Sequence, residues 1–283
     1  MATAPQEKTG AAQIHALAGA DPLFARAHAE ARDAAERDPN MASFLYAAVL
    51  SHDSLESVVA YRLAQRLEAP DMPGAVLARL LLDAMARDQG FGEALRADLV
   101  AVFDRDPACA RILEPTLYFK GFHAIETHRL AHGLWRSGRS DLALWLQSAS
   151  SARFQTDIHP QARIGKGFFL DHATGVVIGS TSVIEDEVSM LHGVTLGGTG
   201  TAAGARHPKV RRGVLIGAGA KILGDIEIGE CARIAAGSVV MESVPAHKTV
   251  AGVPARIIGD VGAAEPSLTM DQLLDEPAHD PGL

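Results

Sequence analysis

The sequence predicts an α+β protein of two domains, an all-α N-terminal domain followed by a parallel β-helix of hexapeptide repeats. Residues 21–147 place apolar side chains three and four apart, as helices do, whereas residues 148–260 place them six apart. The composition, 47% apolar and 21% charged in a chain of 283 residues, suits globular domains with an ample core. We expect residues 1–20 and the acidic, Pro- and Gly-containing residues 261–283 to be flexible.

The first domain reads as a series of helices. DPLFARAHAEARDAAERD opens with Asp-Pro, a typical helix start, and MASFLYAAVLSHDSLESVVAYRLAQRLEAP stops before Pro70. MPGAVLARLLLDAMARDQ and FGEALRADLVAVFDRDPACARIL continue the same spacing, and PTLYFKGFHAIETHRLAHGLWRSG ends near Gly138. These segments predict an all-α domain.

The second domain repeats an aliphatic residue every six positions. A glycine often follows it, as in Ile164-Gly165 and Ile216-Gly217. Two insertions interrupt the repeat, of two residues after Leu170 and of eight after Leu196. The thirteen repeated positions are Ile158, Ile164, Leu170, Ile178, Ile184, Met190, Leu196, Val210, Ile216, Ile222, Ile228, Ile234 and Val240.

A six-residue period fits neither a helix nor ordinary hairpins, and fixed internal periods indicate stacked repeats. The physical interpretation is one short strand per hexad, then a turn that glycine permits, with three hexads in each triangular coil. Each aliphatic side chain then points inward and stacks on its counterpart one coil away, about 4.8 Å along the axis. The repeat therefore predicts a parallel β-helix.

Charge and cysteine content exclude several classes of protein. A net charge of −8 argues against a nucleic-acid binder. Two cysteines, Cys109 and Cys231, are too few for a disulfide framework or a cysteine zinc site. No run of about 18 apolar residues exists to span a bilayer, and MATAPQEKTGAAQ lacks the features of a signal peptide. We expect a cytoplasmic protein that binds neither nucleic acid nor membrane.

Polar residues gather where the repeat is interrupted. LDHATGVV contains Asp171 and His172, and LGGTGTAAGARHPK contains Arg206 and His207. Insertions in repeat proteins lie on the surface and often form the binding face. The two insertions are therefore the candidate functional site.

Several motifs together resemble the serine acetyltransferase family of bacteria and plants. They are DIHPQARIGKGFFLDHATGVVIG, VTLGGTG, RHPK, IGAGAKILG and AGVPARI, and the similarity runs from about Asp21 to Ile258. The resemblance implies a left-handed β-helix. It also implies transfer of acetyl from acetyl-CoA to the hydroxyl of L-serine, which gives O-acetyl-L-serine for cysteine biosynthesis.

His172 is the candidate catalytic base. Acetyl transfer to a hydroxyl needs a base that works near pH 7, and histidine is the natural choice. A carboxylate that fixes its tautomer would assist, and Asp157 precedes His172 by 15 residues, nearly one 18-residue coil. The resemblance likewise implies an Asp157–His172 dyad and direct attack by serine, without an acyl-enzyme.

Serine is a zwitterion, so its site needs a cation for the carboxylate and an anion for the ammonium. Arg206 suits the first role, and Asp171 and Asp106 suit the second. The resemblance implies that Asp106 reaches in from the helical domain and that Arg206 and His207 come from a neighbouring subunit. His207 would orient the substrate or stabilise the oxyanion.

Acetyl-CoA is the expected co-substrate, in a groove between adjacent β-helices where small residues admit the pantetheine arm. We expect no metal: His128 and His132 stand four apart in HAIETHRLAH, but the helix lacks the glutamate of a zinc protease motif. The positions that match the family's CoA groove are Gly198, Thr199, Ala218 and Ala236, with Lys221 and Arg256 as candidates for the CoA phosphates.

The resemblance also implies partners. β-Helices of this class form trimers, and the family's helical domains join two trimers into a hexamer. L-Cysteine is expected to inhibit by occupying the serine site. Many relatives end in an isoleucine that docks into O-acetylserine sulfhydrylase, whereas this chain ends in Leu283, so the tail leaves that partner open.

Three alternatives remain at this point. One is a hexapeptide-repeat acetyltransferase that acts on another hydroxyl or amine acceptor. Another is a β-helix carbonic anhydrase with zinc held by His172, His192 and His207, although their spacing does not match that family. The third is a non-catalytic scaffold, for which the polar insertions have no purpose.

Overall fold

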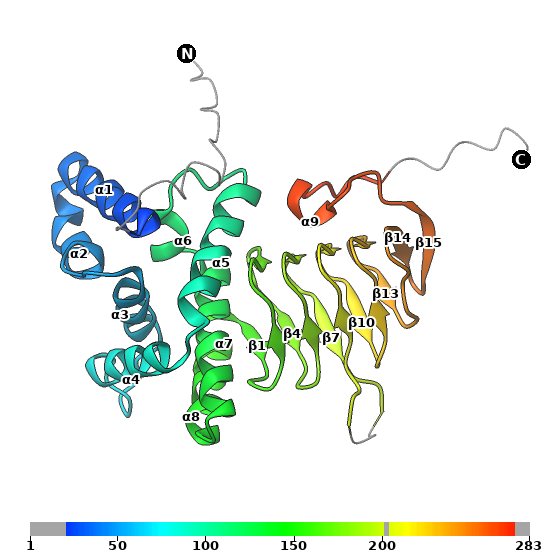
Figure 1. The fold of residues 1–283 in the computed structure, drawn as a ribbon, viewed down its shortest axis with the longest axis horizontal. Helices are drawn as coiled ribbons and strands as arrows, with labels where there is room; N and C mark the ends of the chain where they lie inside the picture. The colour runs from blue at the N-terminus through cyan, green and yellow to red at the C-terminus, as the bar shows by residue number, and fades with distance from the viewer. Residues whose placement is uncertain (1–20, 201–203, 275–283) are drawn as a thin grey trace, which may run out of the picture.

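The computed structural model describes residues 21–200 and 204–274, and it divides them into a helical region and a β-helix (Figure 1). The predicted fold class is confirmed, since helices fill the N-terminal half and stacked parallel strands fill the C-terminal half. The helical elements are α1 Pro22–Arg37, the 3₁₀ turn η2 Pro39–Met41, α2 Ala42–Leu45, the π-helical turn η3 Tyr46–Leu50, α3 Leu55–Leu67, α4 Gly74–Arg87, α5 Phe91–Arg105, α6 Leu113–Leu117, α7 Lys120–Arg136 and α8 Ser140–Phe154.

The helix boundaries follow from capping residues in the sequence. Asp21 accepts a hydrogen bond from the Leu23 N–H at the start of α1, where Pro22 occupies the first helical position. Ser54 and Ser57 form a capping box at the start of α3. These side chains satisfy backbone groups that a helix end leaves unpaired.

The last helix of the helical domain, α8, extends past the boundary expected at residue 147. α8 continues to Phe154 and packs against α7 and strand β1. Its last turns read SASSARF, a polar and small-residue stretch without an apolar pattern, yet Ser150 and Phe154 are buried. Hydrophobic periodicity therefore does not indicate where this helix ends, because tertiary packing rather than an apolar pattern stabilises its last turns.

The β-helix has three flat sheets. The first holds β1-β4-β7-β10-β13, the second β2-β5-β8-β11, and the third β3-β6-β9-β12-β14-β15. Every third strand pairs in parallel, so three hexads make one coil as predicted, and only β14 and β15 among the named strands pair antiparallel. The strands are β1 Thr156–Ile158, β2 Arg163–Ile164, β3 Phe169–Leu170, β4 Val176–Ile178, β5 Val183–Ile184, β6 Ser189–Met190, β7 Thr195–Gly197, β8 Lys209–Val210, β9 Leu215–Ile216, β10 Lys221–Leu223, β11 Glu227–Ile228, β12 Arg233–Ile234, β13 Val239–Val240, β14 Lys248–Gly252 and β15 Ala255–Asp260.

The repeated aliphatic residues form the core of the β-helix. Ile178 pairs with Ile158 on one side and Leu196 on the other, and Ile222 pairs with Leu196 and Val240. These side chains are buried and belong to one apolar cluster that runs the length of the coil. Burial of stacked β-branched side chains is the main stabilising contribution to such a rod.

Residues 261–274 fold back onto the β-helix, although their composition predicted a flexible segment. The short helix α9 Pro266–Thr269 places Ser267 in a buried position, and its carbonyl accepts a hydrogen bond of 2.7 Å from the Ser189 hydroxyl. Arg233 donates to the carbonyl of Leu273 at 2.9 Å. Both contacts are made to backbone carbonyls, so the amino-acid composition of this segment gives no indication of them. Residues 1–20 and 275–283 lie outside the described residues.

Two arginines join the helical region to the β-helix. Arg129 of α7 pairs with Asp98 of α5 at 2.6 Å and donates to the carbonyls of Ile164 and Gly165. Arg105 of α5 donates to the Gly167 carbonyl at 3.0 Å and pairs with Glu187. The two regions are therefore joined by buried, charge-assisted hydrogen bonds beside the first coils.

No helix in residues 21–200 and 204–274 has the length and apolar character that crossing a membrane requires.

Candidate active site

His172 projects from a bulged turn between β3 and β4. The two extra residues of this coil place His172 and Ala173 in the left-handed region, at φ 55° and 60°. Histidine is one of the residues that enter this region most readily. The turn leaves the His172 side chain 73% exposed, so its imidazole is accessible to a substrate.

Among the described residues, Asp171 is the carboxylate that lies within ion-pair distance of His172. The Asp171 Oδ1 to His172 Nε2 distance is 3.7 Å. Asp157 pairs with Val177 on β4, twenty residues later, because the insertion lengthens this coil beyond 18 residues. Asp157 instead accepts a hydrogen bond of 2.7 Å from Gln147 of α8, and no ion pair joins it to His172 within the described protomer. The dyad of Asp157 and His172 therefore stays a prediction.

Asp106, Asp171 and His172 line one pocket of about 370 Å³. Asp106 caps the end of α5 and accepts a hydrogen bond of 2.8 Å from the Ala108 N–H. Lys120 and Gly121, at the start of α7, form another wall. The structure thus brings three of the predicted site residues together from two segments, the end of α5 and the turn after β3.

Burial raises the pKa of the Asp171 carboxyl. The negative charge of Asp106 acts in the same direction, whereas His172 opposes the shift. Two carboxylates that repel each other gain from a cation placed between them, because the cation offsets both charges. The pocket is therefore suited to a ligand ammonium group.

His207 and Arg206 lie at a different edge of the β-helix. His207 is buried, and its Nδ1 accepts a hydrogen bond of 3.2 Å from the Thr181 N–H, which leaves the proton on Nε2. A Cβ on Gly179 would lie 2.1 Å from the His207 ring, so only glycine admits the imidazole there. Burial lowers the pKa of His207, and the nearby charge of Arg206 lowers it further.

The two groups of residues flank the same sheet. We call the edge where the third sheet passes into the first the His172 edge; it carries residues 171–175, 192–193, 218–219 and 236–237. The edge where the first sheet passes into the second is the His207 edge; it carries residues 179–181 and 198–207, apart from the undescribed 201–203. One protomer therefore does not bring His172 and His207 together.

The small residues predicted for the CoA groove divide between the two edges, and Arg256 lies apart from both. Backbone hydrogen bonds of 2.8 Å from Gly219 to His192 and from Gly237 to Ala218 stack Ala218 and Ala236 in line with His192. Lys221 donates to the Gly193 carbonyl beside them. Gly198 and Thr199 belong to the His207 edge, where Gly198 packs against Arg206. Arg256 lies on β15, at a pocket of about 390 Å³ near the C-terminal end of the rod.

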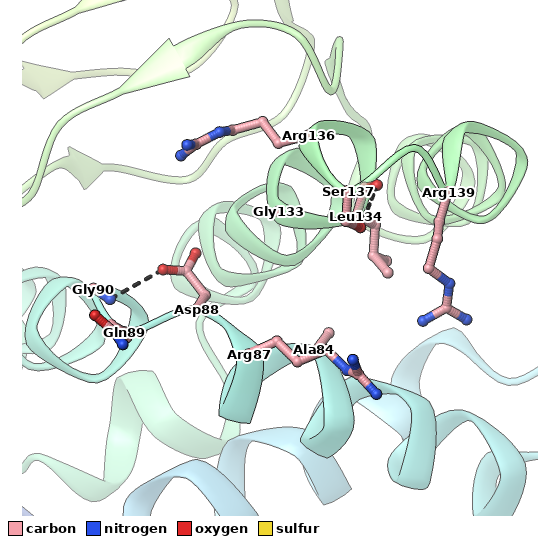
Figure 2. A pocket seen from close by; sticks show the side chains of 10 residues that line it. All are labelled: Ala84, Arg87, Asp88, Gln89, Gly90, Gly133, Leu134, Arg136, Ser137 and Arg139. Atoms are coloured by element: carbon pink, nitrogen blue, oxygen red, sulfur yellow. Dashed lines mark hydrogen bonds between the residues drawn. The ribbon is translucent and has the colours of Figure 1, made fainter.

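A larger pocket of about 760 Å³ lies in the helical domain and contains none of the predicted site residues. Figure 2 shows the hydrogen bond from the Gly90 N–H to Asp88, and it shows Arg136 directed away from Arg139. This pocket is therefore separate from the one that Asp106, Asp171 and His172 line.

The histidines of α7 pack within the fold. Burial lowers the pKa of His128 to about 3, and His132 donates to the Pro160 carbonyl at 2.8 Å. In residues 21–200 and 204–274, no group of three or more potential ligands is arranged to hold a metal ion. The expectation of no metal stays a prediction.

Sequence reasoning missed Gln147, Lys120 and Thr181. Each acts through a contact with a distant segment: Gln147 with Asp157, Lys120 with Thr174, and Thr181 with His207. Thr181 occupies an ordinary turn position of its hexad, so spacing held no signal for it.

A helical domain ahead of a hexapeptide β-helix, with an exposed histidine on a bulged turn beside two carboxylates, defines a hexapeptide-repeat acyltransferase. Family comparisons agree: residues 23–127 match the N-terminal domain of serine acetyltransferase, and residues 207–241 match the bacterial transferase hexapeptide. The chain belongs to the serine acetyltransferase family.

Individual relatives support this assignment. Serine acetyltransferase of Salmonella typhimurium is 52% identical over 86% of this chain and 89% of its own length. The crystal structure of the Vibrio cholerae enzyme superimposes with a TM-score of 0.87 at 52% identity, covering 89% of this chain and 97% of the other. The Brucella abortus enzyme, solved in complex with coenzyme A, is 57% identical with a TM-score of 0.85, covering 86% and 98%. The resemblance seen in the sequence is thereby confirmed.

Proposed function

We propose that the chain transfers the acetyl group of acetyl-CoA to the hydroxyl of L-serine, giving O-acetyl-L-serine and CoA. The observation that carries this proposal is the pocket in which Asp106, Asp171 and His172 meet. It combines an exposed imidazole with two carboxylates, in a chain 52% identical to serine acetyltransferases over most of its length.

His172 acts as the general base. Its unprotonated nitrogen takes the proton of the serine hydroxyl while the hydroxyl oxygen bonds to the thioester carbon. The resulting tetrahedral intermediate expels the CoA sulfur, and the imidazolium returns the proton to that sulfur. Asp157 assists by stabilising the imidazolium from a position on β1 that Gln147 orients.

Asp106 and Asp171 hold the serine ammonium, and Arg206 of an adjacent protomer holds its carboxylate. The raised pKa of Asp171, caused by burial and by Asp106, supports the first contact, because a bound ammonium would relieve that repulsion. His207 carries its proton on Nε2, since Nδ1 accepts from Thr181, and it donates to the developing oxyanion.

The active site forms between protomers. The His172 edge and the His207 edge flank one sheet, so a trimer can place the first edge of one protomer against the second edge of the next. We infer such a trimer, joined in pairs to a hexamer. Acetyl-CoA occupies the groove between the edges, near Gly198, Thr199, Ala218, Ala236 and Lys221, with Arg256 toward its phosphates.

L-Cysteine inhibits by occupying the serine site, since it presents the same zwitterion with a thiol in place of the hydroxyl. A serine acetyltransferase 48% identical to this chain has been solved in complex with cysteine, which supports this inference. Docking of Leu283 into O-acetylserine sulfhydrylase concerns a residue outside the described structure. It stays a prediction, as does the cytoplasmic location.

The test is thiol release from acetyl-CoA by the purified wild-type chain with L-serine, L-threonine, glucosamine or no acceptor. The proposal predicts fast release with L-serine alone and a product with the mass of O-acetylserine. Release with glucosamine but not with L-serine would contradict the proposal. It would instead support the alternative, a hexapeptide-repeat acetyltransferase that acts on another hydroxyl or amine acceptor.

A further inference from the structure

We propose that Lys120 is a positioning residue, which holds the turn that bears His172 through the hydroxyl of Thr174. This inference rests on the proposed function and gives a role to a side chain that the mechanism does not use. Lys120 is the first residue of α7 and lines the same pocket as Asp171 and His172. Its side chain is partly buried, so its ammonium exchanges part of its hydration for partners in the protein.

The Lys120 ammonium binds two neutral oxygens from segments that are distant in the sequence. One is the hydroxyl of Thr174, in the turn after β3. The other is the side-chain carbonyl of Gln155, at the end of α8, at 3.4 Å. Among the described residues, Lys120 forms no ion pair with a carboxylate, so these hydrogen bonds are its contribution to the site. A charged donor makes such bonds stronger than a neutral donor would.

Thr174 connects Lys120 to the backbone of the base. Its hydroxyl accepts a hydrogen bond from Lys120 and donates one to the His172 carbonyl at 3.4 Å. A hydroxyl can do both, because it has one proton and two lone pairs. The hydrogen bonds therefore run from the start of α7, through one hydroxyl, to the residue whose imidazole takes the serine proton.

The turn depends on such contacts because its own backbone is strained. His172 and Ala173 both have positive φ, a conformation that residues other than glycine keep only when their surroundings hold it. The hydrogen bonds within the turn span only two residues, from the Ala173 N–H to the Asp171 carbonyl at 2.6 Å and from the Thr174 N–H to the His172 carbonyl at 2.7 Å. Loss of the Lys120 contact would therefore let the turn relax and would move the imidazole.

The arrangement predicts an effect on the rate of the chemical step rather than on serine binding. In the proposed mechanism Asp106 and Asp171 hold the serine ammonium, and the hydrogen bonds of Lys120 use neither of these side chains. A base that is displaced from its reactive position lowers kcat. Contacts that serine makes equally in the ground state and the transition state set KM, and these contacts would remain.

The experiment is a double-mutant cycle of Lys120→Met and Thr174→Val, which remove the ammonium and the hydroxyl but keep side chains of similar size. Steady-state rates with L-serine and acetyl-CoA are measured for the wild type, the two single variants and the double variant. We expect Lys120→Met to lower kcat about 3- to 10-fold, the range of one lost hydrogen bond, with the KM for L-serine changed less than about twofold. Thr174→Val should lower kcat similarly, and the double variant should lose no more than either single variant, because both changes remove the same contact.

Two further variants separate positioning from general damage. Lys120→Arg keeps the charge and can still donate to a hydroxyl, so its kcat should stay within about threefold of the wild type. Lys166→Met is the matched control, because Lys166 also joins the β-helix to the helical region, through Glu93 of α5, but from a different turn. Its kinetics should be unchanged.

Amide hydrogen exchange of residues 171–175 measures the stability of the turn without any catalysis. We expect faster exchange in Lys120→Met and in Thr174→Val, and the wild-type rate in Lys166→Met. If the wild type itself did not acetylate L-serine, the proposed function would fail, and hydrogen exchange would still test the contact between Lys120 and the turn.

Four results would overturn the proposal. Additive losses in the double variant would mean that Lys120 does not act through Thr174. A higher KM for L-serine with unchanged kcat would make Lys120 a substrate contact instead. An unchanged kcat in Lys120→Met, or unchanged exchange of residues 171–175 in that variant, would mean that the position of the turn does not depend on Lys120.

Discussion

Glu126 is a fully buried carboxyl in α7, beside Asp98 of α5. Burial raises the pKa of Glu126 well above its usual value, and the negative charge of Asp98 acts in the same direction, while Arg129 opposes it. Glu126 therefore keeps its proton to a higher pH in the folded protein than in the unfolded chain, which releases that proton above about pH 4.5.

This difference makes stability depend on pH. Because the folded state binds the extra proton, the free energy of unfolding falls as pH rises from about 4.5 toward the raised folded-state pKa. Glu126→Gln cannot ionise, so we expect it to gain about 1–3 kcal/mol relative to the wild type between pH 5 and pH 8. Urea unfolding at both pH values measures this gain. A difference between the two proteins that stays the same at both pH values would contradict it.

At the level of single residues, the sequence predicted candidate functional side chains but not all of the residues that contact them. Asp171, His172, Arg206 and His207 were predictable because they interrupt a regular repeat. The pairing of Asp157 with His172 stays a prediction; the spacing argument for it assumed an 18-residue coil, whereas the insertion makes that coil twenty residues long. Contacts made across domains, such as Gln147 with Asp157, carry no local pattern.

Among the secondary-structure elements, the start of α7 lies directly against the end of β3. A Cβ at Gly121 would lie 2.0 Å from the Leu170 carbonyl oxygen, so the two backbones approach more closely than any other residue allows. Leu170 immediately precedes Asp171 and His172. The contact with α7 thus fixes the position of the turn that bears His172.

Gly121→Ala should force these elements apart. We expect a loss of about 1–3 kcal/mol in stability, as for overpacked cores, together with a lower kcat because the turn that bears His172 must shift. Thermal unfolding and the serine-dependent rate measure the two effects. Gly259→Ala is the control, since nothing lies within 4 Å of its added Cβ. Equal behaviour of the two variants would refute this view of the α7–β3 contact.

The elements were predictable to different degrees for a physical reason. Hexads impose one inward aliphatic side chain per strand, so the strands could be placed from spacing alone. The end of α8 and the helix α9 depend on packing of polar segments, which periodicity does not encode. Tertiary contacts decide such segments.

For the whole molecule, the proposed site would need an assembly, because its residues are divided between two edges of the β-helix. His172 and His207 lie on opposite borders of the sheet β1-β4-β7-β10-β13, so the proposed mechanism predicts that each active site draws on two protomers. Partner contributions of this kind permit complementation between two inactive variants.

Mixed assemblies of His172→Ala and His207→Ala subunits should therefore recover activity. In a trimer that contains both variants, one interface joins an intact His172 to an intact His207. An equal random mixture then reaches about a quarter of wild-type activity. The two chains would be co-expressed with different tags, purified through both tags, and compared with each variant alone. No recovery in the mixture would mean that both residues serve a site within one protomer.

The most direct measurement is the rate of thiol release from acetyl-CoA with saturating L-serine, for the wild type and for His172→Ala. We expect a loss of about 100-fold or more, the contribution of a general base, with circular dichroism unchanged. A folded His172→Ala that retained most of the wild-type rate would contradict the assignment of His172 as the base and, with it, the mechanism proposed for this site.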